Sequence, residues 1–379
     1  MLLRLLAACL ASSAAGAPSP FSFRASLALD LQPLFDISAP WLGGDIATSV
    51  PLGGGASLWL HGDTLVGSFS GGVRTPTGMP RNSVALLNAS SLGVPSSRLA
   101  HYIKVDAEQP VHFGWFTPPN ASRWYWPTLA LNLGGQGEVF VIAMCMFNAG
   151  SGLFPFAMAG MDVLRVSAAP AWDPPAWPAP ALVATLPIQR DNFTMGCAAA
   201  YDGVTGHVYL LGAAGPHQTA LLARLPAAGF AAGDFAALQF WMPSLAWEAP
   251  PADGSPPYAA AFLFDFTPSE TTLVWHPVMR AWYVVVANTF IYGNSIGLRT
   301  APAITGPWSD FAPVYTVPPE MMAGGVFCYA GKAHAELSPV GAPELVFSFM
   351  CNTDGIPPLL NRSDIYVPQL IRVAVLGLV

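Results

Sequence analysis

Two aspartates flank a predicted β-hairpin near the start of the chain. Asp45 precedes the first predicted strand, Asp63 follows the second, and the run Gly53-Gly54-Gly55 supplies the turn. Antiparallel pairing brings the outer ends of such a hairpin to the same end of a sheet. Two carboxyl groups that face a cleft suffice for glycoside hydrolysis, because one protonates the leaving oxygen while the other acts as nucleophile or activates water. Capping of their own turns by both aspartates is the alternative interpretation.

A second polar segment lies near the C-terminus. Lys332, which is one of only two lysines, alternates with His334 and Glu336 across intervening alanines. In an extended strand this spacing places all three side chains on one face, which suits a polar pocket or an axial channel. A salt-bridged face exposed to solvent is the alternative. A metal site is not predicted, because no second His stands at ligand spacing from His334.

Weaker candidates for substrate binding are spread along the rest of the chain. Arg81 and Asn82 precede one predicted strand, and Glu270 precedes another. Trp126 belongs to an aromatic cluster that could stack against a sugar ring, although burial in the core is the commoner fate of aromatic side chains. The sequence holds no motif for a nucleotide, a dinucleotide, zinc or calcium, so we predict no cofactor and no metal.

The elements that must position these residues are predicted to be strands. Short apolar runs of strand length, bounded by Gly, Pro or Asp, recur along the chain. Five of them share a central aromatic residue and follow one another at intervals of about 70 residues, which indicates repeated units. The five runs are centred on Trp59, Phe140, Tyr209, Tyr283 and Phe347.

A four-stranded unit cannot bury both of its faces alone, whereas radial closure buries the faces between neighbouring units. We therefore predict an all-β fold, a five-bladed β-propeller that forms a single domain over residues 18–379. A pair of β-sandwiches is the competing architecture. It would need a linker near the middle of the chain, and the Pro/Ala-rich stretch 168–184 is the candidate; we interpret that stretch as a loop between blades.

The composition excludes several classes of protein. Hydrophobic residues make up 53% of the 379 residues and charged residues only 10%, which is unlike a disordered chain. The formal net charge of -7 lacks the basic footprint of a nucleic-acid-binding protein. Beyond the N-terminus no apolar run reaches the roughly 20 residues that a membrane span requires. We expect a monomer with a glycan as its partner, and neither nucleic acid nor a membrane span.

The first 17 residues are predicted to be a secretory signal peptide. Arg4 supplies the positive charge, a short apolar core follows, and small residues end the segment. A frayed N-terminal helix is the alternative. In a secreted protein, the four Asn-x-Ser/Thr sequons would be glycosylation points; they begin at Asn88, Asn120, Asn192 and Asn361.

Four cysteines follow the predicted signal peptide. An even number in a secreted chain permits two disulfides. We predict the pairs Cys328–Cys351 and Cys145–Cys197, with buried free thiols as the alternative. No C-x-x-C pair is present, which disfavours a zinc site.

The order of the short motifs resembles that of a known family. The chain reads GGD and LWLHGDT in its first hairpin, followed by RNS and WYWP; later it reads VWHP, LRTAP, TGPWS and AGKAHAEL. This series is similar to a group of secreted five-bladed propellers catalogued as domains of unknown function. The group is related in architecture to the arabinanase and invertase clans, and some members look to be endo-D-arabinanases. The resemblance runs from about Trp41 to Arg372.

The resemblance implies roles for particular residues. Asp45 and Asp63 would be the catalytic pair, and Lys332, His334 and Glu336 would line the pocket. A secreted glycoside hydrolase acting on a furanose-containing or related polysaccharide is the function implied. Glu270 or Glu336 could instead act as a more distant acid. A non-catalytic carbohydrate-binding or cell-surface propeller, and a structural extracellular protein without a ligand, are the other hypotheses.

Overall fold

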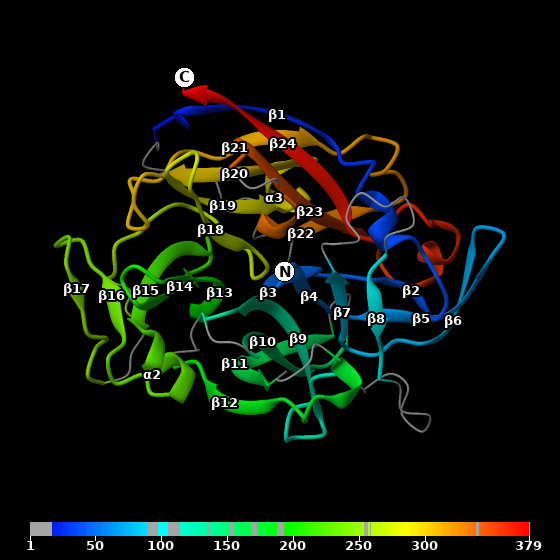
Figure 1. Cartoon of the computed structure of the whole chain (residues 1–379), viewed down its shortest axis with the longest axis horizontal. Coiled ribbons are helices and arrows are strands. Elements are labelled where there is room, and N and C mark those ends of the chain that lie inside the picture. The colour runs from blue at the N-terminus through cyan, green and yellow to red at the C-terminus, as the bar shows by residue number, and fades with distance from the viewer. Residues whose placement is uncertain are drawn as a thin grey trace.

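The computed structural model describes residues 17–88, 98–104, 114–134, 137–151, 155–167, 173–187, 193–253, 257, 259–338 and 341–378. The predicted signal peptide therefore lies outside the described residues except for Ala17. Nearly all the regular structure within the described ranges is β-strand (Figure 1). The all-β prediction is confirmed.

The strands form six antiparallel sheets, and the first two large sheets come from residues 48–185. The first contains β3 (Thr48–Gly53), β4 (Ala56–His61), β7 (Ser83–Asn88) and β8 (Ala100–Tyr102). The second contains β9 (Arg123–Leu131), β10 (Glu138–Asn148), β11 (Phe156–Ser167) and β12 (Ala181–Thr185).

Three further large sheets follow in chain order. The third contains β13 (Phe193–Asp202), β14 (His207–Ala214), β15 (Thr219–Pro226), β16 (Gln239–Trp241) and β17 (Trp247–Glu248). The fourth contains β18 (Thr272–His276), β19 (Ala281–Ala287), β20 (Ser295–Ala301) and β21 (Ala312–Thr316). The fifth contains β22 (Phe327–Ala333), β23 (Glu344–Asn352), β24 (Gln369–Leu378) and the N-terminal β1 (Phe21–Leu27).

A small sheet extends the first hairpin. It contains β2 (Trp41–Gly44), β5 (Thr64–Ser70) and β6 (Val73–Gly78). The helical segments of the described chain are short, and they comprise α2 (Ala227–Ala232), α3 (Thr289–Tyr292) and the 3-10 helices η1 (Gln32–Phe35), η3 (Pro174–Ala176), η4 (Ala335–Leu337) and η5 (Pro357–Asn361). None of these helices has the length and hydropathy of a membrane span.

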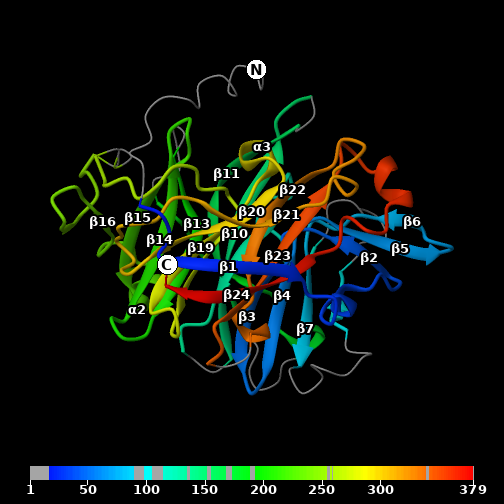
Figure 2. The same cartoon turned by 90° about the horizontal axis from the view of Figure 1, so that it is seen from above.

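The five large sheets surround a common centre (Figure 1). One edge strand of each large sheet lies innermost, and these strands contact one another in sequence: β3 with β9, β9 with β13, β13 with β18, β18 with β22, and β22 with β3. The N-terminal β1 runs beside the C-terminal β24 (Figure 2), with which it pairs antiparallel. This pairing joins the two ends of the described chain within one sheet.

The apolar runs are continuous because both faces of each sheet are buried. Each of the five predicted aromatic-centred runs forms the strand next to the innermost one in a different large sheet. Adjacent residues on such a strand point to opposite faces and enter the cores on either side. The pairs that share a buried cluster are Leu58 with Val141, Ile142 with Leu210, Leu211 with Val284, Val285 with Phe347, and Val346 with Trp59.

One of the two predicted disulfides is confirmed. Cys328 and Cys351 form a disulfide that joins β22 to β23. The second prediction was wrong, because Cys145 and Cys197 are buried free thiols. Cys145 lies on β10 of the second sheet within the apolar cluster that this sheet shares with the first. Cys197 lies on β13 of the third sheet, so the two thiols occupy different layers.

Candidate active site

A cavity of about 700 Å³ opens where the innermost strands begin. Residues from all five large sheets or from the segments leading into them line it, among them Asp45, Trp126, Thr194, Glu270 and Tyr329. Convergence of several elements on one cavity lined by both apolar and polar side chains is typical of a ligand site. We call this cavity the carboxylate pocket, because the carboxyl groups of Asp45, Asp63 and Glu270 all line it.

Asp45 and Asp63 lie at a break in one long hairpin. The ladder pairs Gly44 with Thr64 on one side of the break and Thr48 with Leu60 on the other. Between these pairs the backbone N–H of Asp45 donates to the carbonyl of Asp63 (3.4 Å). The break thus holds the two aspartates side by side, as antiparallel pairing predicted.

The backbone beside Asp45 adopts an uncommon conformation. Ile46 and Ala47, which follow it, have φ values of 67° and 54°, in the left-handed region that side-chain-bearing residues rarely occupy. Gly62 faces them without a side chain, since a Cβ there would lie 2.3 Å from Oδ1 of Asp45. Such conformations cost about 1–3 kcal/mol each and cluster at functional sites.

Asp63 has partners that favour its ionised form. Arg81 makes a 3.1 Å ion pair with it, and the indole N–H of Trp126 donates to its Oδ1 (2.9 Å). The guanidinium of Arg81 also lies 4.6 Å above the ring of Trp124, which is a cation–π contact. Burial raises the pKa of Asp63, while Arg81 and Trp126 oppose that rise.

Asp45 has fewer such partners. The phenol of Tyr329 donates to its Oδ2 (2.7 Å), and Oδ1 is buried without a hydrogen-bond partner among the described residues. Burial raises the pKa of Asp45 well above its ordinary value, and the neighbouring charges of Asp63 and Glu270 raise it further. The environments of Asp45 and Asp63 therefore differ, so that Asp45 retains a proton more readily than Asp63.

Glu270 is the third carboxyl group of the pocket. Burial raises its pKa, whereas the charge of Lys332 and a hydrogen bond from Ser269 (3.2 Å) lower it. Lys332 lies fully buried, and its ammonium donates to the carbonyls of Thr128 (2.6 Å) and Thr271 (3.2 Å). Burial lowers the pKa of Lys332 to about 8.

The expectation that Lys332, His334 and Glu336 line the pocket together was wrong. The alternation is not maintained, because β22 ends at Ala333 and the 3-10 helix η4 begins at Ala335. His334 is fully buried, with Ser49 (2.7 Å) and Ser348 (2.7 Å) as hydrogen-bond partners. Glu336 lines a different cavity, of about 1530 Å³, at the opposite ends of the innermost strands.

Asn82 also lies outside the pocket. Its side chain is buried; the amide donates to the carbonyls of Phe116 (3.0 Å) and Tyr125 (2.9 Å), and its oxygen accepts from the N–H of Phe116 (2.7 Å). Asn82 therefore fastens two chain segments to each other and does not face a ligand. Of the substrate-binding candidates, the structure brings Arg81, Trp126 and Glu270 to the pocket.

Tyr329 and Tyr366 are pocket residues that sequence reasoning missed. Tyr329 stands three positions before Lys332, outside the alternating polar residues from which the pocket lining was predicted. The phenol of Tyr366 donates to the carbonyl of Asp63 (2.9 Å). Tyr366 lies 303 residues from Asp63, and no local pattern links the two positions.

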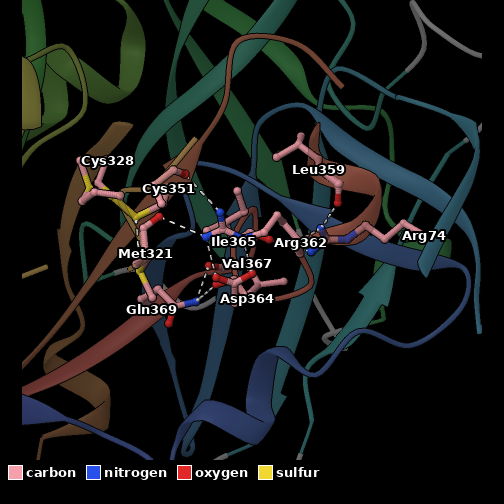
Figure 3. A network of polar contacts seen from close by, with 12 residues as sticks. Arg74, Met321, Cys328, Cys351, Leu359, Arg362, Asp364, Ile365, Val367 and Gln369 are labelled. Carbon is pink, nitrogen blue, oxygen red and sulfur yellow. Dashed lines mark hydrogen bonds and ion pairs between the residues drawn. A yellow bond between two sulfur atoms is a disulfide. The ribbon is translucent and has the colours of Figure 1, made fainter. Parts of the chain in front are cut away.

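A buried arginine holds the segment that carries Tyr366 (Figure 3). Arg74 on β6 donates to the carbonyls of Leu359, Arg362 and Ile365, each at 2.7 Å, and to that of Leu42 at the same distance. Its side chain is nearly inaccessible to solvent, and burial lowers its pKa to about 10. Arg74 thereby ties the small sheet beside Asp45 and Asp63 to the loop behind them.

Comparison with known proteins gives a family match and a fold. The model of a family described as domain of unknown function (DUF5005) matches residues 29–375. No sequence among the curated proteins matches this chain. A provisionally assigned hydrolase from Bacteroides ovatus ATCC 8483 is structurally similar, with a TM-score of 0.66 and 16% identity over 94% of this chain and 92% of the other.

Two more distant structures carry bound oligosaccharides. The alpha-L-arabinofuranosidase PaAbf62A from Podospora anserina, in complex with cellotriose, aligns with a TM-score of 0.49 and 10% identity over 96% of this chain and 99% of that one. A GH62 hydrolase in complex with xylotriose aligns with a TM-score of 0.47 and 9% identity over 94% and 98%. Of the three similarities, the first alone is close enough to establish a shared fold.

Proposed function

The chain belongs to the family described as domain of unknown function (DUF5005), and we propose that it is a glycoside hydrolase that acts with paired carboxyl groups. The observation that carries this proposal is the position of Asp45 and Asp63. They lie side by side, line one open cavity, and have environments that separate their pKa values. An acid and a base held together in this way are the apparatus of glycoside hydrolysis.

The different environments of Asp45 and Asp63 assign them different catalytic roles. Asp45 would be the general acid, because burial and the charges of Asp63 and Glu270 favour its protonated form. Asp63 would act as nucleophile or as the base that activates water, since Arg81 and Trp126 favour its ionised form. Glu270 would keep the proton on Asp45 through its own charge, as carboxyl groups that share a site do.

The proposal includes a five-bladed propeller fold and an extracellular location. The five large sheets with contacting innermost strands support a five-bladed β-propeller over residues 18–379 as a single domain. The disulfide between Cys328 and Cys351 supports an oxidising, extracellular location. Residues 1–17 would then be the signal peptide, and the protein would act as a secreted monomer.

A furanose-containing polysaccharide is the proposed substrate. Release of reducing sugar from arabinan, arabinogalactan, arabinoxylan and D-arabinan tests this directly. We expect cleavage of at least one arabinose-containing glycan. Activity confined to glycans without furanose residues would contradict the substrate class, and activity on none of an extended panel would contradict hydrolysis itself.

A further inference from the structure

A row of three aromatic rings leads from the rim of the carboxylate pocket to Asp45. Phe290 is 54% exposed although it lines the pocket. Its ring lies 5.1 Å from that of Phe327, which in turn lies 5.6 Å from that of Tyr329. The ring planes differ by 33° and 29°, so the rings face similar directions. We call these three residues the aromatic shelf.

The shelf is held rigidly from behind. Phe290 lies on the short helix α3, where Oδ1 of Asn288 accepts from the N–H groups of Phe290 (3.0 Å) and Ile291 (3.2 Å). The hydroxyl of Thr289 accepts from the N–H of Cys328 (2.8 Å) and donates to its carbonyl (3.2 Å). The disulfide of Cys328 then fastens β22 to β23.

Such anchoring fixes the backbone from which Phe290 projects before any ligand arrives. A ring on a fixed backbone loses less conformational freedom when a ligand binds, which improves affinity. Exposed apolar side chains scattered singly are common on surfaces. This one differs because it lines the carboxylate pocket and its helix is anchored to the strand that carries the next ring.

The inner end of the shelf contacts the proposed chemistry. The phenol of Tyr329 donates to Asp45 and accepts from the side-chain amide of Asn352 (3.3 Å). A ligand on the shelf would therefore meet apolar ring faces first and polar groups at the inner end. Sugar rings match this arrangement of apolar and polar surfaces, because they present one face of C–H groups and a polar edge of hydroxyls.

We propose that the aromatic shelf is a binding subsite for a sugar residue beyond the two that the cleaved bond joins. The inference rests on the proposed function and names its substrate class, an oligosaccharide of several neutral residues. Neutral sugars are favoured because Arg81, the cation among the pocket-lining residues, is paired with Asp63, which leaves the negative charge of Glu270 unopposed in that lining. Acidic sugars would be repelled at this end of the pocket.

The test compares long and short substrates with a variant that removes the outer ring. Phe290→Ala removes an exposed side chain, so the fold is retained. With α-1,5-linked arabinotetraose, and then with the tetrasaccharide of any other glycan that the native protein cleaves, we expect KM to rise about tenfold while kcat is unchanged. With the corresponding disaccharide, which does not reach the rim, we expect KM to be unchanged.

Two variants serve as controls. Phe290→Tyr keeps the ring and should restore the native KM. Phe262→Ala removes another exposed phenylalanine, which is 64% accessible and outside the pocket lining. It should leave KM unchanged for both substrates. If Phe290→Ala raised KM equally for the tetrasaccharide and the disaccharide, or for neither, the proposal would be overturned. A change in oligomeric state with KM unaltered would overturn it too, because the shelf would then serve self-association.

The proposed function can fail separately. Calorimetric titration of the tetrasaccharide into Asp63→Asn, with and without Phe290→Ala, measures binding without turnover. If the native protein cleaves no glycan but Phe290→Ala weakens this binding about tenfold, hydrolysis is refuted and the subsite stands. If cleavage occurs and the titrations are identical, hydrolysis stands and the subsite is refuted.

Discussion

The phenol of Tyr329 donates a 2.7 Å hydrogen bond to Oδ2 of Asp45, across 284 residues of sequence. The backbone is strained on both sides of this contact. Ala47 and Ala330 both have positive φ values, and they pack together with Tyr329 in one small cluster. Local strain is therefore concentrated where the first sheet meets the fifth, beside the proposed acid.

The Tyr329 hydrogen bond favours the ionised form of Asp45. Tyr329→Phe should therefore raise the pKa of Asp45 further. If Asp45 is the acid, the alkaline limb of the pH profile of kcat/KM should move to higher pH. The same profile of Tyr315→Phe, a tyrosine outside the pocket, should match that of the native protein. A limb that stays in place or moves to lower pH in Tyr329→Phe contradicts the assigned role.

Arg81 favours the ionised form of Asp63 through its 3.1 Å ion pair. Arg81→Met should raise the pKa of Asp63, so the acidic limb of the pH profile should move to higher pH. At a pH below that limb, activity should fall roughly tenfold or more for each unit that the limb moves. Arg81→Lys keeps the charge and should move the limb less. If the acidic limb does not move in Arg81→Met, the ion pair with Arg81 is not what favours the ionised form of Asp63.

The buried His61 and the half-buried His101 should make the fold sensitive to acid. The rings of His61 and His101 lie 5.5 Å apart, and that of His101 stacks on Trp41 at 4.3 Å. Burial lowers the pKa of His61 to about 4 and that of His101 well below its ordinary value. Since the unfolded chain protonates near 6.5, the stability they contribute is complete above that pH and is lost as the pH falls towards 4.

His61→Phe keeps an aromatic ring in place of the imidazole and removes one of the two titrations. Between pH 6 and 4.5 the free energy of unfolding should decrease less steeply in the variant, by up to about 1.4 kcal/mol per pH unit. Denaturant unfolding at several pH values measures this difference. Parallel dependence in both proteins would show that His61 protonates equally in the folded and unfolded states.

The disulfide should stabilise the fold and the pocket together. Its loop closes 23 residues, and a loop of this size contributes about 3 kcal/mol to the free energy of unfolding. Replacement of both Cys328 and Cys351 by alanine should lower the denaturant midpoint accordingly. Reductant should lower the midpoint of the native protein but not that of the double variant. A native protein that is insensitive to reductant under unfolding conditions would contradict this.

The all-β fold and the first hairpin could be predicted from the sequence because they rest on local patterns. The aromatic-centred runs identify one strand in each large sheet, since a strand buried on both faces must be apolar throughout. Asp45 and Asp63 could be predicted to lie together because they stand eighteen positions apart with a glycine turn midway, which is the pattern of one hairpin.

The rest of the pocket could not be predicted, because it depends on contacts between distant segments. Tyr329 and Tyr366 reach the aspartates from the fifth sheet and from the loop before β24. The alternation of Lys332, His334 and Glu336 suggested a single face, but β22 ends at Ala333 and η4 begins at Ala335, so the three residues do not share one strand. Asn82 bonds to backbone groups far along the chain.

The central claim is that Asp45 and Asp63 together cleave a glycosidic bond. The most direct measurement is reducing-sugar release by the native protein, by Asp45→Asn and by Asp63→Asn, on the best glycan of the panel. We expect measurable release by the native protein and at least a hundredfold loss in each variant, with both variants folded by circular dichroism. Native-like activity in either folded variant would contradict it.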